Sequence, residues 1–444
     1  MPPQINAKGQ WVEEYAGPYG GLNVQVPESL LADNESPALS NFLLRNSELR
    51  SLPVFTKKFD TPNNGQILGI TSFRDVNGIF HTVIWQFNKI FQYNPATPPP
   101  PWDDITGSTQ VQGPYPVAYR SFANILWYTN VNQFFSSDVL GHVRLTTHPF
   151  LAYWDGITAG FIATQTQYDA SVTQSAAGIA AASSAAVSGT LAQFYSQIGG
   201  PRAGPLAIGA QYLGELNNQL ILANVSMRDQ ATGDVFSMPN LVWWSANGLP
   251  LEWDPTHNTS AGFNALLDVS DQITGLATLG VAGYLFRNAG ISQFSPSGSA
   301  VAPFQFNHMW ASEHGIGSVL PWSIAQYGPQ AAFVAEDNVY SLTLTNASPI
   351  GGGARDAIMR DVAANSGIDP SIQQRIPVGA IIPRFSDGYV YLSYELSIPL
   401  PQTSGGLRQR IYNYSFAEKY WEVWDIPKPN LTEPKLITAQ PNYV

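Results

Sequence analysis

Residues 271–298, DQITGLATLGVAGYLFRNAGISQFSPSG, contain three short apolar runs separated by glycine-containing turns. The runs cover residues 273–278, 283–288 and 290–294. Each run has the length of a typical strand, and glycine tolerates the positive φ angles of tight turns. This stretch therefore predicts a meander of three short antiparallel strands.

The same plan, in which a strand, a polar or Gly/Asn turn and a hydrophobic strand follow one another, recurs four times. The recurrences are ILGITSFRDVNGIFHTVIWQFNKIFQY (67–93), YPVAYRSFANILWYTNVNQFF (115–135), YLGELNNQLILANV (212–225) and SIAQYGPQAAFVAEDNVYSLTL (323–344). Repetition at roughly 40–50 residues is the signature of a radial or solenoid β architecture.

Counting these units and the strands near the C-terminus gives six. The predicted units lie at 66–106, 114–147, 205–254, 271–298, 315–346 and 378–425. Residues 148–164 are aromatic and less regular, and fall outside the second unit. We therefore expect an all-β fold, a six-bladed β-propeller with helical and loop insertions.

The remaining segments complete the predicted domain map. An N-terminal arm with entry strands (1–65) precedes the first blades (66–168), an Ala/Ser-rich insertion (169–204), the middle blades (205–350), a helical insertion (351–376), the last blade (377–426) and a C-terminal tail (427–444). The Ala/Ser-rich insertion fits a helix packed on a neighbour, a mobile loop at the open end of an assembly, or a lipid contact. Its many Ser and Gln residues disfavour the lipid contact.

Within residues 353–374, apolar positions recur at helical spacing and Gly367 supplies a stop signal. The helix predicted there and the Ala/Ser-rich insertion interrupt the repeat. We expect these two segments to make contacts between rings or at the tip of an assembly.

Charge content narrows the classes of function. The net charge is −11, and charged residues make up only 12% of the chain. A chain with few clustered cations is a poor phosphate-backbone binder, although an acidic channel lets DNA pass without sticking. So few charges, without a membrane span, indicate that much of the surface is covered by partners.

Several other classes are excluded or disfavoured by the sequence. The chain has no cysteine, which excludes disulfides and thiolate metal sites. We find no apolar signal region near the N-terminus and no apolar window of about 18 residues, so we expect neither secretion nor a transmembrane helix. The Asn-X-Ser/Thr sequons are then chance matches.

An N-terminal segment, GGLNVQVPESLLADNESPALSNFLLRNSELRSLPVF (20–55), predicts a hairpin near its end, with strands at 41–44 and 49–52. The segment resembles the N-terminal part of virion proteins that form the distal tail tube, or nozzle, of short-tailed phages. The residues that carry the resemblance are Gly21, Leu22, Asn23, Pro27, Leu30, Asn34, Ser36, Pro37, Asn41, Leu49, Arg50 and Pro53. It departs from the pattern at Leu52, where relatives carry Arg, and at Val54, where they carry Gly.

The resemblance implies a structural virion protein in which this segment leads into a β-propeller. It implies a homo-oligomeric ring, expected to be a hexamer, that docks on adaptor and portal proteins and with which tail fibres could associate. Genomic DNA would pass through the lumen without specific binding during ejection. The protein would be assembled in the host cytoplasm and located in the phage tail, without stable membrane insertion.

Catalytic motifs are missing or weak. The sequence has no P-loop, no HExxH and no GxSxG motif. An enzyme would have to use carboxylates, as glycosidases do. The candidates by residue type are Asp103, Asp104, Glu252, Asp254, Asp268 and Asp271. Solvated turn acids and strand-end caps are the simpler interpretation of all six.

Three further patterns could indicate a metal site, a sialidase site or a sugar-binding site. His308 and His314, with Glu313, are a poor metal set. Ser72–Gly78 resembles a sialidase repeat, but the Ser72–Asp75 spacing is wrong and the motif does not recur. The aromatic residues Trp243, Trp244 and Trp253 could stack on sugars, although packing between blades is the more economical role.

We therefore expect no enzyme activity and no catalytic, cofactor-binding or metal-binding residues. The sequence leaves two alternatives to the tail nozzle. One is a receptor-binding or glycan-degrading tail propeller, and the other is a monomeric scaffold propeller.

Overall fold

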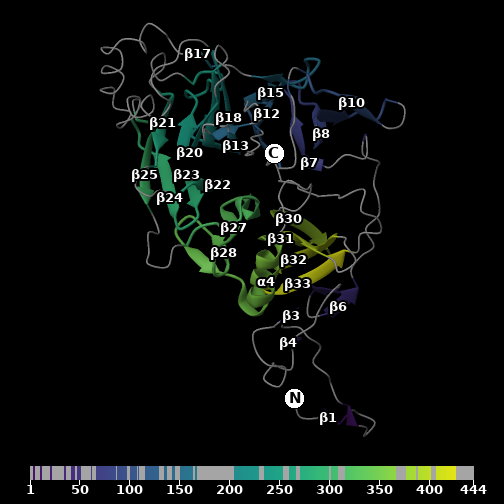
Figure 1. Ribbon diagram of the computed structural model, residues 1–444. Helices are drawn as coiled ribbons and strands as arrows, with labels where there is room; N and C mark the ends of the chain where they lie inside the picture. The colour runs from purple at the N-terminus through teal and green to yellow at the C-terminus, as the bar shows by residue number, and fades with distance from the viewer. Residues whose placement is uncertain are drawn as a thin grey trace.

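The computed structural model describes most of the repeat region and only short strands elsewhere (Figure 1). The described residues are 62, 67–86, 88–97, 101–107, 109, 116–129, 135–137, 143–145, 151–163, 166–167, 205–229, 235–253, 260–266, 271–299, 302–308, 316–366, 377–386, 389–401 and 407–426, with 4–5, 11–12, 21–22, 35–36, 42–45 and 48–51. The predicted Ala/Ser-rich insertion beyond Gln167 and the tail from residue 427 lie outside them.

Six antiparallel sheets form six blades, which confirms the predicted six-bladed β-propeller (Figure 1). Blade 1 contains β7 (Ile67–Arg74), β8 (Phe80–Gln86), β9 (Lys89–Tyr93) and β10 (Trp102–Asp104); blade 2 contains β11 (Ala118–Phe122), β12 (Ile125–Thr129), β15 (Leu151–Trp154) and β16 (Ile162–Ala163). Blade 3 contains β17 (Thr166–Gln167), β18 (Pro205–Leu216), β19 (Gln219–Asp229), β20 (Val235–Trp244) and β21 (Gly262–Ala265).

The second half of the chain continues the pattern. Blade 4 contains β22 (Ile273–Leu279), β23 (Ala282–Arg287), β24 (Ile291–Pro296) and β25 (Phe304–His308); blade 5 contains β26 (Ala325–Tyr327), β27 (Gln330–Val334), β28 (Val339–Leu342) and β29 (Ala347–Pro349); blade 6 contains β30 (Val378–Ser386), β31 (Tyr389–Pro401), β32 (Leu407–Ser415) and β33 (Trp421–Ile426). The three strands predicted in residues 271–298 are therefore confirmed, and β25 adds a fourth.

Blade 2 corrects one predicted boundary. Residues 114–147 contribute only its first two strands, while β15 and β16 come from the segment that looked irregular. The intervening β13 (Phe135–Ser137) and β14 (Val143–Leu145) pair only with each other. Trp154 and Phe161 are buried in the blade 1–blade 2 core, so these aromatic residues of the segment serve core packing.

Tight turns follow the sequence signals. Asn217 and Asn218 have φ angles of 53° and 60°, and Asn88 has a φ of 61°. Asparagine tolerates the left-handed region better than other non-glycine residues. Both predicted asparagine turns thus fix the register of the hairpins β18–β19 and β8–β9.

The first long strand of each blade is the innermost, which in blade 3 is β18 because the two-residue β17 precedes it, and the strands of blade 3 are counted from β18 below. Contacts between neighbouring blades join β11 to β18, β18 to β22, β22 to β26 and β26 to β30. Connections between the first and second strands, and between the third and fourth, must therefore lie on one axial side of the propeller. We call this side the turn face, and the opposite side the helix face.

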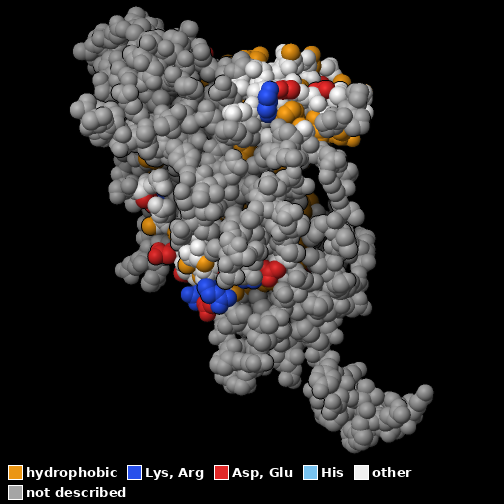
Figure 2. Space-filling model, turned by 45° about the vertical axis from the view of Figure 1, so that its right-hand side comes forward, with side chains coloured by type: hydrophobic (Ala, Val, Ile, Leu, Met, Phe, Trp, Pro, Cys, Tyr) orange, Lys and Arg blue, Asp and Glu red, His pale blue; other side chains and the backbone are white. Residues whose placement is uncertain are grey.

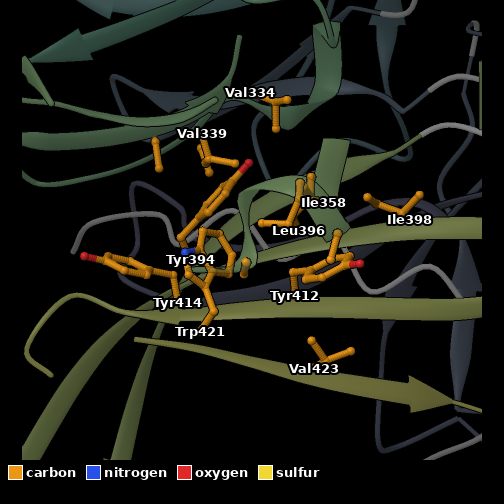
Figure 3. Close-up of a cluster of buried hydrophobic side chains, with 14 of the residues drawn as sticks. Val334, Val339, Ile358, Tyr394, Leu396, Ile398, Tyr412, Tyr414, Trp421 and Val423 are labelled. Atoms are coloured by element: carbon orange, nitrogen blue, oxygen red, sulfur yellow. The ribbon is translucent and has the colours of Figure 1, made fainter. Parts of the chain in front are cut away.

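Apolar clusters fill five of the six junctions between consecutive blades. One cluster joins each of the pairs 1–2, 2–3, 3–4, 4–5 and 5–6. In the last of these, Figure 3 shows Tyr394, Tyr412 and Trp421 of blade 6 close to Ile358 of the helix. Alternating inward side chains of strands, with a helix laid over them, produce this core.

The helix face carries α4 (Arg355–Ser366), preceded by the 3₁₀ turn η3 (Gly352–Ala354), between blades 5 and 6 (Figure 1). This confirms the helix predicted within 353–374 and its end before Gly367. A second 3₁₀ turn, η2 (Pro321–Ser323), precedes blade 5. None of the described helices is long and apolar enough to cross a membrane.

The N-terminal strands are not part of any blade. They form the pairs β1 (Gln4–Ile5) with β2 (Trp11–Val12), β3 (Gly21–Leu22) with β4 (Glu35–Ser36), and β5 (Phe42–Arg45) with β6 (Glu48–Ser51). The β5–β6 pair is the hairpin predicted from the sequence. Because β3 and β5 contact β33, these two strands lie beside the last blade.

Candidate functional site

The exposed large apolar side chains of the described residues all lie on the turn face. They are Val76, Ile79, Phe80, Ile157, Ile162, Leu249, Leu251, Val281 and Leu344. Each lies in a connection between the first and second strands or between the third and fourth strands of its blade, or is the first residue of the strand that follows such a connection. They come from blades 1 to 5, so apolar side chains are exposed around most of one side of the propeller.

These residues are densest where blades 1 and 2 meet. We define the corner patch as Arg74, Val76, Ile79, Phe80 and Ile157. Val76 is 69% exposed and Phe80 is 61% exposed. Figure 2 brings blade 1 forward and shows hydrophobic side chains there beside a basic side chain and acidic ones.

The two turns of the corner patch lie against each other. A Cβ added to Gly156 would come within 2.8 Å of His81 Nε2 and 2.9 Å of Asp75 Cβ. Gly156 also has a φ of 83°, a conformation that other residues rarely adopt. Glycine is therefore required where the Ile157 turn crosses the Asp75 turn.

Asp75 builds the first turn. Its Oδ1 accepts hydrogen bonds from the backbone N–H groups of Asn77 at 2.9 Å and Ile79 at 2.8 Å. Burial raises the pKa of Asp75, but these N–H groups and His81 outweigh burial and leave the pKa lowered. The carboxylate is thus held charged while the side chains that follow it are presented to solvent.

A buried hydrogen-bond chain supports Asp75 from below. His81 Nε2 lies 3.2 Å from Asp75 Oδ2, and Gln92 Nε2 lies 2.8 Å from His81 Nδ1. The imidazole also stacks on Phe73 and meets the edge of Trp154. Because the amide nitrogen of Gln92 can only donate, His81 Nδ1 accepts from it, and the N–H at Nε2 donates to Asp75.

Asp155 builds the second turn by the same device. Its Oδ1 accepts hydrogen bonds from the N–H of Ile157 at 2.9 Å, and from the N–H and hydroxyl of Thr158 at 2.8 and 2.9 Å. Trp154 Nε1 donates to the carbonyl of Thr158 at 3.0 Å. Burial raises the pKa of Asp155, and the three donors outweigh it, so the pKa is lowered.

Polar side chains link the inner strands around the axis. The guanidinium of Arg120 on β11 donates to Thr278 Oγ1 on β22 at 3.3 Å. Gln326 Oε1 on β26 accepts the N–H of Thr278 at 2.8 Å. Half-burial raises the pKa of Glu215 on β18, an effect that the charge of Arg120 opposes. Four blades thus share polar contacts near the axis.

On the helix face, charged groups tie α4 to blade 6. Arg410 contacts Asp425 through two hydrogen bonds of 2.8 and 3.0 Å, and donates to Asp361 of α4 at 2.9 Å. The hydroxyl of Tyr412 donates to the same carboxylate at 2.6 Å. Hydrogen bonding to Asp425 is the main cause of the raised pKa of Arg410.

The four carboxylates singled out from the sequence that the structure describes do not converge. Asp103 accepts from Asn94 at 2.6 Å and from Thr97 at 2.8 Å within one turn. Asp104 pairs with Lys89, and Asp271 lies 3.5 Å from the buried Arg287. Glu252 is in the β20–β21 connection of blade 3. Asp254 and Asp268 lie outside the described residues.

The three tryptophans are buried, which excludes sugar stacking on their rings and confirms their role in blade packing. Trp243 is fully buried and donates to the carbonyl of Trp253 at 2.9 Å. Trp244 meets the edge of Phe304 in the blade 3–blade 4 core.

The remaining predicted sites are only partly described. His308 ends β25, and Glu313 and His314 lie outside the described residues. Within the described residues, no cluster of three or more His, Asp or Glu side chains could hold a metal ion.

Sequence reasoning missed the corner patch, although a signal was present. The Ser72–Gly78 stretch was compared with a sialidase repeat, while the apolar residues that follow Asp75 were not considered. Two Asp-started turns, DVNGIF (75–80) and DGIT (155–158), each place an isoleucine after a glycine.

Comparisons with known proteins give only distant structural likenesses. No family model matches the sequence, and neither does any curated protein. The WD40 domain of SCAP from fission yeast is 8% identical over 82% of this chain and 75% of its own, with a TM-score of 0.32. A subtype N11 neuraminidase-like protein of A/flat-faced bat/Peru/033/2010 (H18N11) is 8% identical over 85% of this chain and 93% of its own, with a TM-score of 0.32. Neither description names a phage protein.

Proposed function

We propose that this chain is a structural virion protein that forms the distal tail nozzle of a short-tailed bacteriophage. In this proposal, copies assemble as a ring, expected to be a hexamer, that docks on the adaptor and portal complex and conducts DNA during ejection. The observation that carries the proposal is that, in the part of the chain that the structure describes, the exposed large apolar side chains are confined to the turn face. An exposed apolar side is what a protein needs for stacking on another ring.

Two sequence features support the same role. The segment at 20–55 resembles the N-terminal part of tail-nozzle proteins, and β3 and β5 of this segment lie beside the last blade. The chain also has only 12% charged residues and a net charge of −11. Few charges suit wide subunit contacts, and an acidic balance suits a lumen through which DNA slides.

Imaging the purified full-length chain by negative-stain electron microscopy tests the proposal. We expect cyclic rings with an open central channel. A particle that stays monomeric, and that releases sugars from bacterial surface polysaccharide, would instead identify a glycan-degrading propeller. A monomer without such activity would indicate a scaffold propeller and would also reject the nozzle.

A further inference from the structure

We propose that the corner patch binds a protein segment that presents an aliphatic side chain close to a carboxylate. The inference rests on the proposed docking role of the turn face and gives that role a partner of defined chemistry. It is carried by three properties of the patch: exposed apolar area, one exposed cation, and a preorganised backbone.

The apolar part of the patch spans two blades. Val76 and Ile79 project from the β7–β8 turn, and Ile157 projects from the β15–β16 turn that packs on it. Isolated exposed apolar residues are normal on protein surfaces, whereas a contiguous group indicates a binding site. The close approach of Gly156 to Asp75 and His81 places the two turns, and the apolar residues that they expose, side by side.

The cationic part is Arg74, the last residue of β7. Its Nε donates to the carbonyl of Gly78 at 2.9 Å, and its guanidinium lies 5.4 Å from the centre of the Phe80 ring. These contacts hold an exposed guanidinium in place and use one of its five N–H donors. A fixed guanidinium binds a carboxylate through two parallel hydrogen bonds.

The charges around Arg74 favour an anionic partner. Among the described residues, Arg74 has no ion-pair partner. The nearby Asp75 is buried, and its oxygens accept from Asn77, Ile79 and His81. Lys89, the other described cation of blade 1, pairs with Asp104. The charge of Arg74 is therefore available to a ligand, on a chain whose overall charge is negative.

The backbone beneath the patch is fixed before any partner arrives. Asp75 and Asp155 each bind the N–H groups of their own turn, and His81 and Gln92 support Asp75 from the core. A surface that is already ordered loses little conformational entropy on binding. Arginine and aromatic residues on such a base are typical of interface hot spots.

Ligand-observed NMR titrations of the full-length chain with two short peptides test this inference. The probes are acetyl-Ala-Leu-Leu-Glu-amide and its glutamine counterpart, acetyl-Ala-Leu-Leu-Gln-amide. We expect the glutamate peptide to bind about tenfold more tightly, the size of one charge-assisted contact. In R74Q the two peptides should bind equally, and in I79S both should weaken.

Two controls isolate the patch. V281S removes an exposed apolar side chain from the turn face at blade 4, and should leave both affinities unchanged. R74K keeps the charge but removes the two-pronged geometry, and should give an intermediate preference. Circular dichroism melting curves that match wild type would show that each variant is folded.

Equal affinity of the two peptides for the wild-type chain would overturn the inference, as would a glutamate preference that survives in R74Q. Light scattering that shows self-association abolished by I79S would also overturn it, because the occupant would then be a second copy. The nozzle proposal fails separately. Peptide binding by a chain that forms no ring would reject the nozzle, and ring formation without peptide binding would reject only the corner-patch partner.

Discussion

The two axial faces of this propeller are stabilised in different ways. On the turn face, short hairpin connections are fixed from within by aspartates that bind their own backbone, and apolar side chains point outward. On the helix face, α4 buries its apolar side against blade 6, and a charged network fastens it. Charge is buried under α4 and apolar surface is exposed on the turns, so the helix covers part of one face at blades 5 and 6, whereas the apolar groups of the other face are left available.

The largest expected effect on stability comes from a substitution on the helix face. R410L would leave the carboxylates of Asp361 and Asp425 without their shared cation, and Asp361 is buried. Removing one partner of a buried charged network leaves an uncompensated charge. Because Asp425 is partly exposed, we expect a loss of about 3 kcal/mol in the free energy of unfolding, at the lower end for such sites.

Guanidinium unfolding monitored by tryptophan fluorescence measures this loss. R355A is the matched control, because exposed Arg355 at the start of α4 lies 4.0 Å from exposed Asp356 and otherwise donates one exposed hydrogen bond to the carbonyl of Asp337. Exposed pairs contribute little, so its effect should stay below about 0.5 kcal/mol. Equal effects of the two substitutions would show that the Arg410 network does not hold the helix.

A smaller effect is expected from D155N on the turn face. The amide keeps one acceptor but loses the charge that the donors of Ile157 and Thr158 stabilise. Since this turn is partly exposed, D155N should lower the free energy of unfolding by about 1 kcal/mol or less near neutral pH.

Acid sharpens the same comparison. The pKa of Asp155 is lowered in the folded chain from its ordinary value of 3.8. Its contribution is therefore complete above the unfolded pKa and is lost as the pH falls through the lower folded pKa. Unfolding curves between about pH 5 and pH 2 should converge for wild type and D155N. Curves that stay parallel over this range would contradict the assigned role of the carboxylate.

The smallest effect on stability is expected from I79S. The side chain is 56% exposed, and its backbone N–H still donates to Asp75. Exposed substitutions away from caps change stability by less than about 0.5 kcal/mol. A larger drop in the melting temperature would mean that Ile79 is structural, and that the turn face is less available than the comparison implies.

The fold could be predicted from the sequence because its blades are local. Each hairpin is specified by its own apolar pattern and by a turn residue such as Asn217 or Gly280, so the repeat is visible in the sequence. Blade 2 was harder, because the β13–β14 hairpin interrupts it and separates β12 from β15. A long interruption hides which strand completes a sheet.

The candidate site could not be predicted in the same way. From the sequence, an isoleucine such as Ile79 or Ile157 is expected to be a buried strand residue, and only the structure shows that both are exposed. Adjacency of the two turns depends on Gly156 meeting Asp75 across the contact between two blades. The sequence placed the assembly contacts on the helix and the Ala/Ser-rich insertion; that prediction remains to be tested, and the structure motivates the turn face as a competing location.

Hydroxyl-radical footprinting of the purified ring, before and after its assembly into the tail, tests the central claim most directly. The account predicts that Ile79, Phe80 and Ile157, with Leu251 and Leu344, become protected on assembly. Side chains at the solvent side of α4, such as Arg360, should stay equally reactive. Protection confined to α4, with the turn face unchanged, would contradict the account.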